Sequence, residues 1–186
     1  MKSKRLPGRF FERVFHPGLL FLREYYHLWT VSPGLVYRAC QYRRRRLAEV
    51  IRALGLRSVL NLRGANPRAR WWRDEVEICA RLGVGHYDLN LSARQVPSPK
   101  QLEELVRILA SAPKPLLFHC EGGGSRTGLA SAIYKYRFEG LSCRRARRQF
   151  SVIYGHFPLF HPSTRAMERA FLDFCRISGS GRPLPE

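Results

Sequence analysis

The sequence predicts an α/β domain with a central, mostly parallel β-sheet flanked by helices. The chain has 186 residues, a length that fits one ordinary domain. Its residues are 45% hydrophobic and 25% charged, a balance typical of a globular protein and not of a disordered chain. Its apolar segments alternate between short runs of β type and longer stretches of helical period, and this alternation favours a parallel sheet whose strands are joined by helices.

Residues 1–34 are predicted to form a basic, aromatic appendage. The pattern leaves two interpretations open: a helix packed on the domain, or a helix lying in a membrane interface. A secretory signal peptide is disfavoured, because charged residues and Pro17 interrupt the apolar stretch and no small-residue cleavage site follows. The aromatic and apolar residues at helical spacing are Phe10, Phe11, Val14 and Phe15.

The first half of the domain, which we expect to span residues 35–178, alternates between strand and helix. Short apolar runs predict the strands. Apolar residues three and four positions apart predict the helices, which end at Gly55 and Gly83. The predicted elements are strand 35–38, helix 44–54, strand 58–62, helix 72–82 and strand 84–91.

The second half begins with a helix whose start is well marked. Ser98 is a good N-cap, Pro99 takes the first helical position, and Gln101 completes a capping box. The apolar run 116–119 then predicts a short strand buried on both faces. At least two helices fill 127–177, and residues 179–186 form a tail.

The formal net charge of +19 predicts attraction to polyanions. Two clusters, at 43–46 and 144–148, are rich in arginine. Either cluster alone reads as a solvated helix face. Together with the overall charge, they favour a highly anionic substrate or an anionic membrane surface as partner. Nucleic acid is the least favoured partner, because no aromatic residues that could stack on bases interleave with the clusters.

The five cysteines do not form a recognisable framework. Their number is odd, their spacings are wide and no Cys-x-x-Cys occurs, which disfavours disulfides and a zinc site. We therefore expect a reducing, cytoplasmic location, peripheral to the membrane if residues 1–34 bind one, and no metal or cofactor. Outside the loop described next, the cysteines are predicted to be small buried side chains: Cys40, Cys79, Cys143 and Cys175.

A glycine-rich loop between the strand 116–119 and the next helix carries the chemistry. Backbone N–H groups in such a loop converge on an anion, and the helix dipole adds positive potential. A Walker loop and a dinucleotide fingerprint are excluded by the spacing. The loop reads His119, Cys120, Glu121, Gly122, Gly123, Gly124, Ser125, Arg126, Thr127.

The position of Cys120 indicates nucleophilic catalysis. Amide donors and Arg126 favour a thiolate there, aimed at the anion that residues 121–126 would bind. Arg126 can hold two oxygens of a phosphoryl group in its transition state. The implied reaction is attack on phosphorus, a cysteinyl-phosphate intermediate and hydrolysis by water.

The motif His119-Cys120-x5-Arg126-Thr127 resembles the signature of the cysteine-dependent phosphatases, especially small atypical dual-specificity members. The stretches 31–41 and 58–64 are similar to flanking segments of those members, and the resemblance covers about residues 30–175. It implies the dual-specificity phosphatase fold, with Cys120 as nucleophile and Arg126 as phosphate ligand. It also implies that the Thr127 hydroxyl eases departure of the sulfur and that His119 tunes the thiolate.

The general acid is not evident. The family usually places an aspartate on the loop after the third strand, and here residues 92–97 hold no carboxyl group. Asp88 lies inside the predicted strand, where a structural role is mildly favoured over an acid. Glu121 is the second candidate, with a solvated side chain as the favoured reading. Arg94 is a candidate contact for a second phosphate.

The favoured function is therefore a phosphomonoesterase. Its substrate could be a phosphoprotein, an inositol phosphate or a phospholipid. A catalytically weak phosphate-binding relic and a basic nucleic-acid-binding protein stay open as alternatives. We expect Trp71 and Trp72 to serve packing more than substrate binding, and His156 and His161 to be structural.

Overall fold

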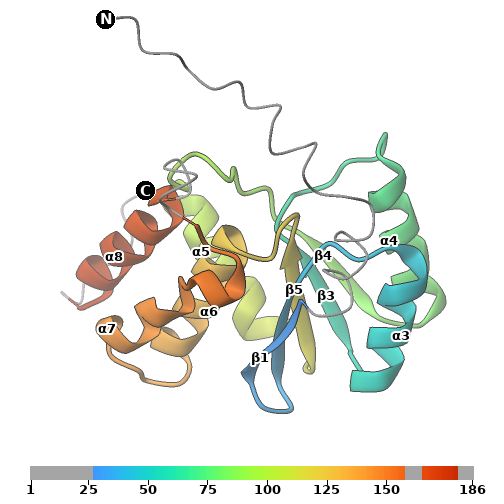
Figure 1. Ribbon diagram of the computed structural model, residues 1–186, viewed down its shortest axis with the longest axis horizontal. Coiled ribbons are helices and arrows are strands. Elements are labelled where there is room, and N and C mark those ends of the chain that lie inside the picture. Colours follow the sequence, from blue (N-terminus) through green and yellow to red (C-terminus); the bar gives the residue numbers. More distant parts are fainter. Residues whose placement is uncertain (1–26, 158–164, 180–186) are drawn as a thin grey trace, which may run out of the picture.

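The computed structural model describes residues 27–157 and 165–179. It places a five-stranded sheet between two groups of helices (Figure 1). Helices α3 and α4 lie on one side of the sheet in this view, and α5, α6, α7 and α8 lie on the other. The predicted α/β class with a central, mostly parallel sheet is confirmed.

The sheet has the strand order β1-β2-β5-β3-β4. Only the pairing of the edge strand β1 with β2 is antiparallel; the other three pairings are parallel. The carboxyl ends of four strands therefore meet at one edge of the sheet. The strands are β1 (Leu28–Ser32), β2 (Val36–Cys40), β3 (Ser58–Asn61), β4 (Gly85–Asp88) and β5 (Leu116–Cys120).

Two hydrophobic cores hold the layers together, one on each face of the sheet. One core joins the sheet to α3 (Arg44–Leu54) and α4 (Arg70–Arg81). The larger core joins it to α5 (Pro99–Ser111), α6 (Ser125–Arg137) and α8 (Arg165–Gly179). Between α6 and α8 run α7 (Cys143–Ala146) and two 3-10 turns, η1 (Arg147–Gln149) and η2 (Val152–Tyr154).

Local signals in the sequence located most elements correctly. The helix at 44–54 has the predicted bounds, and Gly55 ends it in the left-handed conformation that glycine adopts most readily. The predicted capping box is present: the Ser98 hydroxyl accepts from the Gln101 amide, and the Gln101 side chain accepts from the Ser98 amide. The strand predicted at 84–91 is shorter, since β4 ends at Asp88.

The predicted boundary of the appendage needs correction. Residues 28–32 form β1, which pairs along β2 and completes the sheet, so this part of 1–34 belongs to the domain. The predicted helix around Phe10 to Phe15 lies outside the described residues, as do His161 and most of the tail. None of the helices in the described part is long and apolar enough to cross a membrane.

The prediction for Cys143 and Cys175 is wrong, because the two form a disulfide between α7 and α8. They lie 32 residues apart in the sequence, and only the packing of α8 beside α7 brings them together. Cys40 and Cys79 are buried and form no disulfide, as expected. The disulfide also removes the argument for a reducing compartment, so the cytoplasmic location stays a prediction. Within residues 27–157 and 165–179, no cluster of three or more His, Cys, Asp or Glu could hold a metal.

Candidate active site

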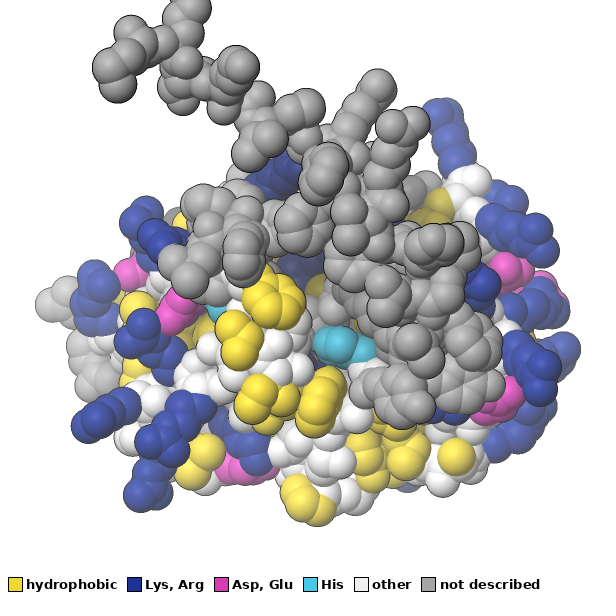
Figure 2. Space-filling view, in the orientation of Figure 1, with side chains coloured by type: hydrophobic (Ala, Val, Ile, Leu, Met, Phe, Trp, Pro, Cys, Tyr) yellow, Lys and Arg dark blue, Asp and Glu magenta, His cyan; other side chains and the backbone are white. Residues whose placement is uncertain are grey.

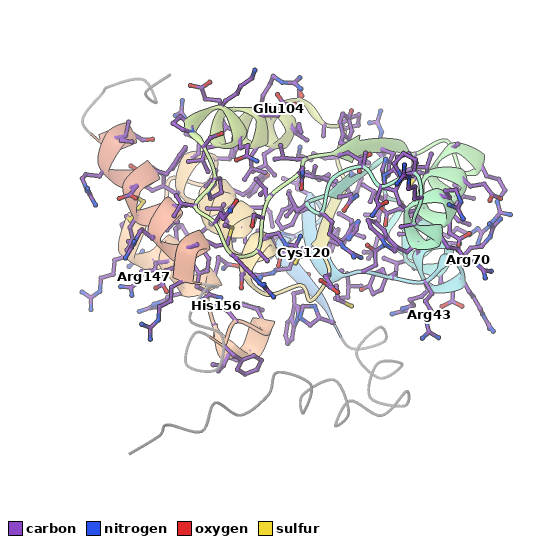
Figure 3. The ribbon with its side chains drawn as sticks, turned by 90° about the horizontal axis from the view of Figure 1, so that it is seen from above. Arg43, Arg70, Glu104, Cys120, Arg147 and His156 are labelled. Carbon is purple, nitrogen blue, oxygen red and sulfur yellow. A yellow bond between two sulfur atoms is a disulfide. The ribbon has the colours of Figure 1, made fainter. Side chains whose placement is uncertain are left out.

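The sheet brings the predicted site residues to the carboxyl edge of its parallel strands. Cys120 ends β5, and its register partner on β2 is Cys40. On the other side of β5, His119 pairs with Asn61, which in turn pairs with Asp88 at the end of β4. In open α/β sheets this edge is where ligands bind. Figure 3, which looks onto this region from above, shows Cys120 near the middle of the molecule.

Cys120 lies at the floor of the glycine-rich loop. Its Sγ accepts a hydrogen bond from the amide of Gly123 at 3.2 Å, and α6 begins at Ser125, directly after the loop. Both the amide and the amino end of the helix stabilise negative charge on the sulfur. The residue is 3% exposed, so a substrate must approach it through the mouth of the loop.

Two loop glycines are required by the close packing around them. A Cβ on Gly123 would lie 2.2 Å from Cε1 of His27, and its φ of +70° disfavours other residues. A Cβ on Gly124 would lie 2.3 Å from the carbonyl oxygen of Gly155. The loop backbone is thus clamped between the start of β1 and the turn after η2, which keeps its amides in place.

Arg126 and Glu121 lie where the motif predicts an anion site. Arg126 is 9% exposed, and its Nη1 donates to the carbonyl of Leu91 at 3.4 Å. Its Nη2 lies 4.0 Å from Oε2 of Glu121. The Glu121 side chain is 72% exposed, which agrees with the favoured reading of a solvated carboxylate.

Arg38 of β2 supports the loop from inside the protein. It is fully buried, and its Nη2 lies 3.0 Å from the carbonyl of Gly123 and 2.9 Å from that of Gly124. Nη1 donates to the carbonyl of Gln149 at 3.0 Å, and the guanidinium sits 4.6 Å from the ring centre of Tyr154. One side chain therefore ties β2, the loop and the segment after α7 together.

The charge of Arg38 acts on the sulfur as well as on the loop. Burial lowers the pKa of Arg38 to about 10, and its electrostatic interactions with Cys120 and Tyr154 oppose that shift. The guanidinium thus stays protonated at neutral pH. It adds to the positive potential that the loop amides and Arg126 place around Cys120.

Glu75 of α4 supports the strand on the opposite face of the sheet. Its Oε1 accepts from Nε2 of His119 at 3.0 Å and from Nε2 of His86 at 2.9 Å, and Oε2 accepts from Gln41 at 2.6 Å. Burial raises the pKa of Glu75, but the charge on His119 and these hydrogen bonds outweigh it and hold the pKa well below its usual range. His119 is therefore fixed beside Cys120 by a buried carboxylate.

Thr127 lies beneath the loop. Its hydroxyl is hydrogen-bonded to the carbonyls of Gly123 and Gly124 and accepts from Nη2 of Arg38 at 2.9 Å. These contacts position the loop. The predicted part of this hydroxyl in releasing the sulfur stays a prediction.

Ser125 contacts His156, so this histidine lies beside the loop as well as in the packing of the domain. Its hydroxyl lies 3.1 Å from Nδ1 of the buried His156, whose Nε2 is 3.8 Å from a carboxylate oxygen of Glu168 in α8. The first residue of α6 is therefore held by the segment that packs on α8.

The carboxylate of Asp88 is occupied by packing partners. Both oxygens lie 3.1 Å from the indole nitrogen of Trp72, and Oδ1 accepts from the Asn61 amide at 2.7 Å. Trp72 belongs to α4, so these contacts are on the face of the sheet that carries His119 and Glu75. The preferred structural reading of Asp88 agrees with this arrangement, as does the packing reading of Trp72.

Arg63 was not singled out by the sequence. Its guanidinium stacks 3.8 Å from the ring centre of Trp71, and its Nη1 donates to Oε1 of Gln41 at 3.2 Å. Burial lowers the pKa of Arg63. Electrostatic interactions with Glu121 and Cys120 oppose this shift, and the positive charge of Arg126 adds to it. Arg63 is thus a further cation at the rim of the loop.

Two other residues of the site, Arg38 and Glu75, were not predicted from the sequence. The available signal was a charged residue at a position that the pattern predicts to be buried. Arg38 interrupts an apolar strand, and Glu75 stands at helical spacing with the buried Ile78 and Cys79. A charged residue in a buried position needs a partner. Nothing in the sequence, however, identified the loop as that partner.

Known structures share this architecture. P. aeruginosa TpbA in complex with phosphotyrosine is 20% identical, with a TM-score of 0.64 over 84% of this chain and 92% of that one. The catalytic core of the S. cerevisiae PP-IP phosphatase SIW14 is 20% identical, with a TM-score of 0.60 over 85% and 94%. PTPMT1 is 15% identical, with a TM-score of 0.60 over 82% and 99%.

The family assignment comes from the sequence match. Among curated protein sequences, none matches the chain. The family described as "Swiss Army Knife protein, DSP-PTPase phosphatase domain" matches residues 27–166, which include the strands β1 to β5 of the described part and the whole loop. The chain belongs to this family, PTP-SAK, and is a cysteine-based phosphatase of the protein tyrosine and dual-specificity type.

Proposed function

We propose that the protein hydrolyses phosphate monoesters through a cysteinyl-phosphate intermediate on Cys120. The observation that carries the proposal is the position of its sulfur. Sγ accepts a hydrogen bond from the amide of Gly123, two residues before α6 begins, and Arg38 and Arg126 add positive charge around it. A thiolate in such a site is a nucleophile aimed at whatever anion the loop binds.

The reaction takes two steps. The thiolate attacks phosphorus, the S–P bond forms, and the bond from phosphorus to the ester oxygen breaks. The loop amides of residues 121–125 and the Arg126 guanidinium hold the equatorial oxygens as charge develops. Water then attacks phosphorus, the S–P bond breaks, and the water gives up a proton as phosphate leaves.

The leaving group is the weak point of this mechanism. The carboxylate of Asp88 is held by Trp72 and Asn61, and Glu121 faces solvent. A general acid is typically worth a factor of about 10² to 10⁴ in rate. We infer that good leaving groups, such as aryl phosphates and phosphoanhydrides, are the better substrates.

A highly anionic substrate is the class we favour. The net charge of +19 supports it, and basic side chains gather at both ends of the view in Figure 2. The neighbours offer phosphotyrosine and an inositol pyrophosphate as examples of suitable chemistry. An anionic membrane surface, which would bring a phospholipid substrate, stays a prediction.

The test is turnover of 4-nitrophenyl phosphate by wild type and Cys120→Ser, with vanadate and a chelator as separate additions. We expect turnover that vanadate stops, the chelator leaves intact and Cys120→Ser abolishes. Iodoacetamide should label Cys120 and inactivate the enzyme, and phosphate should protect it. Full activity in Cys120→Ser, or no labelling of that sulfur, would overturn the proposal.

A substrate panel tests the leaving-group inference. We expect kcat/KM on the aryl phosphate to exceed that on a phosphoserine peptide by at least about 100-fold. Equal values would mean that a proton donor operates. Phosphate binding without turnover of any substrate in the panel would favour the phosphate-binding relic instead.

A further inference from the structure

A groove lies beside the catalytic loop, between the start of α3 and the start of α4. Its volume is about 390 Å³. Arginines and carboxylates line it together: Arg43, Arg44, Arg45 and Arg70 stand beside Asp74 and Glu75, and Tyr42, Leu47 and Trp71 supply apolar surface. We call it the α3–α4 groove. Figure 3 shows Arg43 and Arg70 together on one side of Cys120.

The groove and the catalytic loop share a wall. Gln41 lines the groove, and its backbone amide donates to the carbonyl of Glu121 in the loop at 3.3 Å. Trp71 lines it too. Arg63 stacks on Trp71 and interacts electrostatically with Cys120 and Arg126. Gln41, Trp71 and Arg63 therefore connect the groove to the loop.

The carboxylates beside these arginines leave room for an anion. Glu75 is committed to His119 and His86, and Asp74 is shared between Arg44 at 3.4 Å and Arg70 at 3.6 Å. The Arg70 side chain is 87% exposed, so its pair with Asp74 contributes little and a phosphate can compete for it.

Arg45 is a second exposed cation at the groove, whereas Arg44 holds α3 and α4 together. The Arg45 side chain is 91% exposed and pairs with Glu49 of its own helix at 3.0 Å. Arg44 instead pairs with Glu77 of α4, and so ties the two helices together. The groove therefore combines two helices held together by Arg44 with guanidinium groups that reach solvent. This arrangement is suited to binding phosphate.

We propose that the α3–α4 groove is a second anion subsite, which holds another phosphate of the substrate whose first phosphate lies at Cys120. The proposal rests on the proposed function and narrows its substrate to molecules with two or more phosphates. Such a molecule is either a soluble polyphosphorylated compound or the headgroup of a polyphosphorylated lipid.

The experiment compares two double variants that lose the same charge. Arg45→Ala with Arg70→Ala removes two rim residues. Arg52→Ala with Arg81→Ala removes exposed arginines from the far ends of the same helices. For each we measure the ratio of kcat/KM on inositol hexakisphosphate to that on 4-nitrophenyl phosphate. The same ratio is measured with vesicles of phosphatidylcholine containing a phosphatidylinositol bisphosphate.

We expect the rim variant to lower the ratio about tenfold and the control variant to keep the wild-type ratio, since two exposed charge contacts are lost only in the first. A fall on the soluble substrate assigns the subsite to a soluble polyphosphate; a fall on vesicles alone assigns it to a headgroup. An unchanged ratio on both, or an equal fall in the control, would overturn the subsite.

A binding measurement separates the subsite from catalysis. In a Cys120→Ser background, calorimetry with inositol hexakisphosphate needs no turnover. We expect the rim variant to raise Kd about tenfold relative to the far-end control. If the wild type turns over no substrate, the proposed function fails while this measurement still decides the subsite. Equal Kd values in the two variants would overturn it.

Discussion

Two buried charges of opposite sign hold the catalytic loop, and they do so in different ways. Arg38 binds the carbonyls of Gly123 and Gly124, so it acts on the loop itself. Glu75 binds His119, so it acts on the strand just before Cys120. The conformation of the loop therefore depends on the guanidinium, and its placement on the sheet depends on the carboxylate.

Electrostatics sharpen the difference between these two supports. Arg38 adds positive charge near the sulfur. Glu75 adds negative charge on the far side of His119, where hydrogen bonds from His119, His86 and Gln41 stabilise that charge. Loss of Arg38 should therefore cost both stability and activity, whereas loss of the Glu75 charge should cost mainly stability.

The largest effect is expected for Arg38→Met. The substitution leaves loop carbonyls buried without their donor, and breaking a buried charged network typically costs about 3–5 kcal/mol. We expect the free energy of unfolding in urea to fall by about that amount and kcat on 4-nitrophenyl phosphate to fall at least about 100-fold.

Arg38→Lys is the matched control, because it keeps the charge but cannot reach two carbonyls and Gln149 together. It should recover part of the stability and little of the activity. Wild-type activity in Arg38→Lys would show that charge alone, and not the geometry of the guanidinium, supports the loop.

Glu75→Gln should have the next largest effect. The amide can still accept a hydrogen bond but loses the charge that holds His119 and His86, a change worth about 1.5–3 kcal/mol. We expect this loss of unfolding free energy at pH 7, with a fall in kcat much smaller than in Arg38→Met. A larger loss of kcat than in Arg38→Met would reverse the comparison.

The pH dependence of this loss follows from the lowered pKa of Glu75. The stabilisation is present above the unfolded pKa, about 4.3, and disappears as the pH falls through the lower folded value. The stability difference between wild type and Glu75→Gln should therefore be present at about pH 5 and shrink below about pH 4. Urea unfolding at these pH values checks it, and a difference that grows as the pH falls from about 5 to 3 would contradict it.

The loop could be predicted from the sequence because its parts are contiguous. The apolar strand, the glycines and the next helix stand in one stretch, and 119–127 carries the nucleophile and the phosphate ligand together. The same holds for the helix at 99–111, whose capping box is formed by Ser98 and Gln101, three residues apart. Signals of this kind depend on neighbours in the chain.

The supports of the loop could not be predicted, because they depend on neighbours in space. Arg38 reaches a loop 85 residues away, and Glu75 reaches a histidine 44 residues away. The disulfide between Cys143 and Cys175 likewise depends on the packing of α8 beside α7. β1 was missed because residues 28–32 pair only with β2, and their place in the sheet follows from that pairing.

Asp88→Asn, on the same face of the sheet as Glu75, should have a smaller effect on stability than Glu75→Gln. If the Asp88 carboxylate serves only to accept hydrogen bonds from Trp72 and Asn61, the substitution should cost about 1–2 kcal/mol of unfolding free energy. The kcat on a phosphoserine peptide should change less than threefold, because general acid catalysis would have supplied about 10² or more. Trp72→Phe, which removes the indole donor, should reproduce the stability loss, and a 100-fold fall in kcat for Asp88→Asn alone would make Asp88 the acid.

His156→Gln should have the smallest effect, and its signature is a change in pH dependence on the Arg38 side. Burial lowers the pKa of His156 and Arg38 lowers it further, while Glu168 partly restores it. The unfolded chain therefore takes up a proton near pH 6.5 before the folded protein does, so this histidine costs the wild type stability as the pH falls below that value. In His156→Gln that contribution is absent, and the decline in unfolding free energy between pH 7 and 5.5 should be shallower by up to about 1 kcal/mol. An equal decline in both proteins would mean that His156 takes up its proton at the same pH in the fold as in the unfolded chain, which would contradict the lowered pKa.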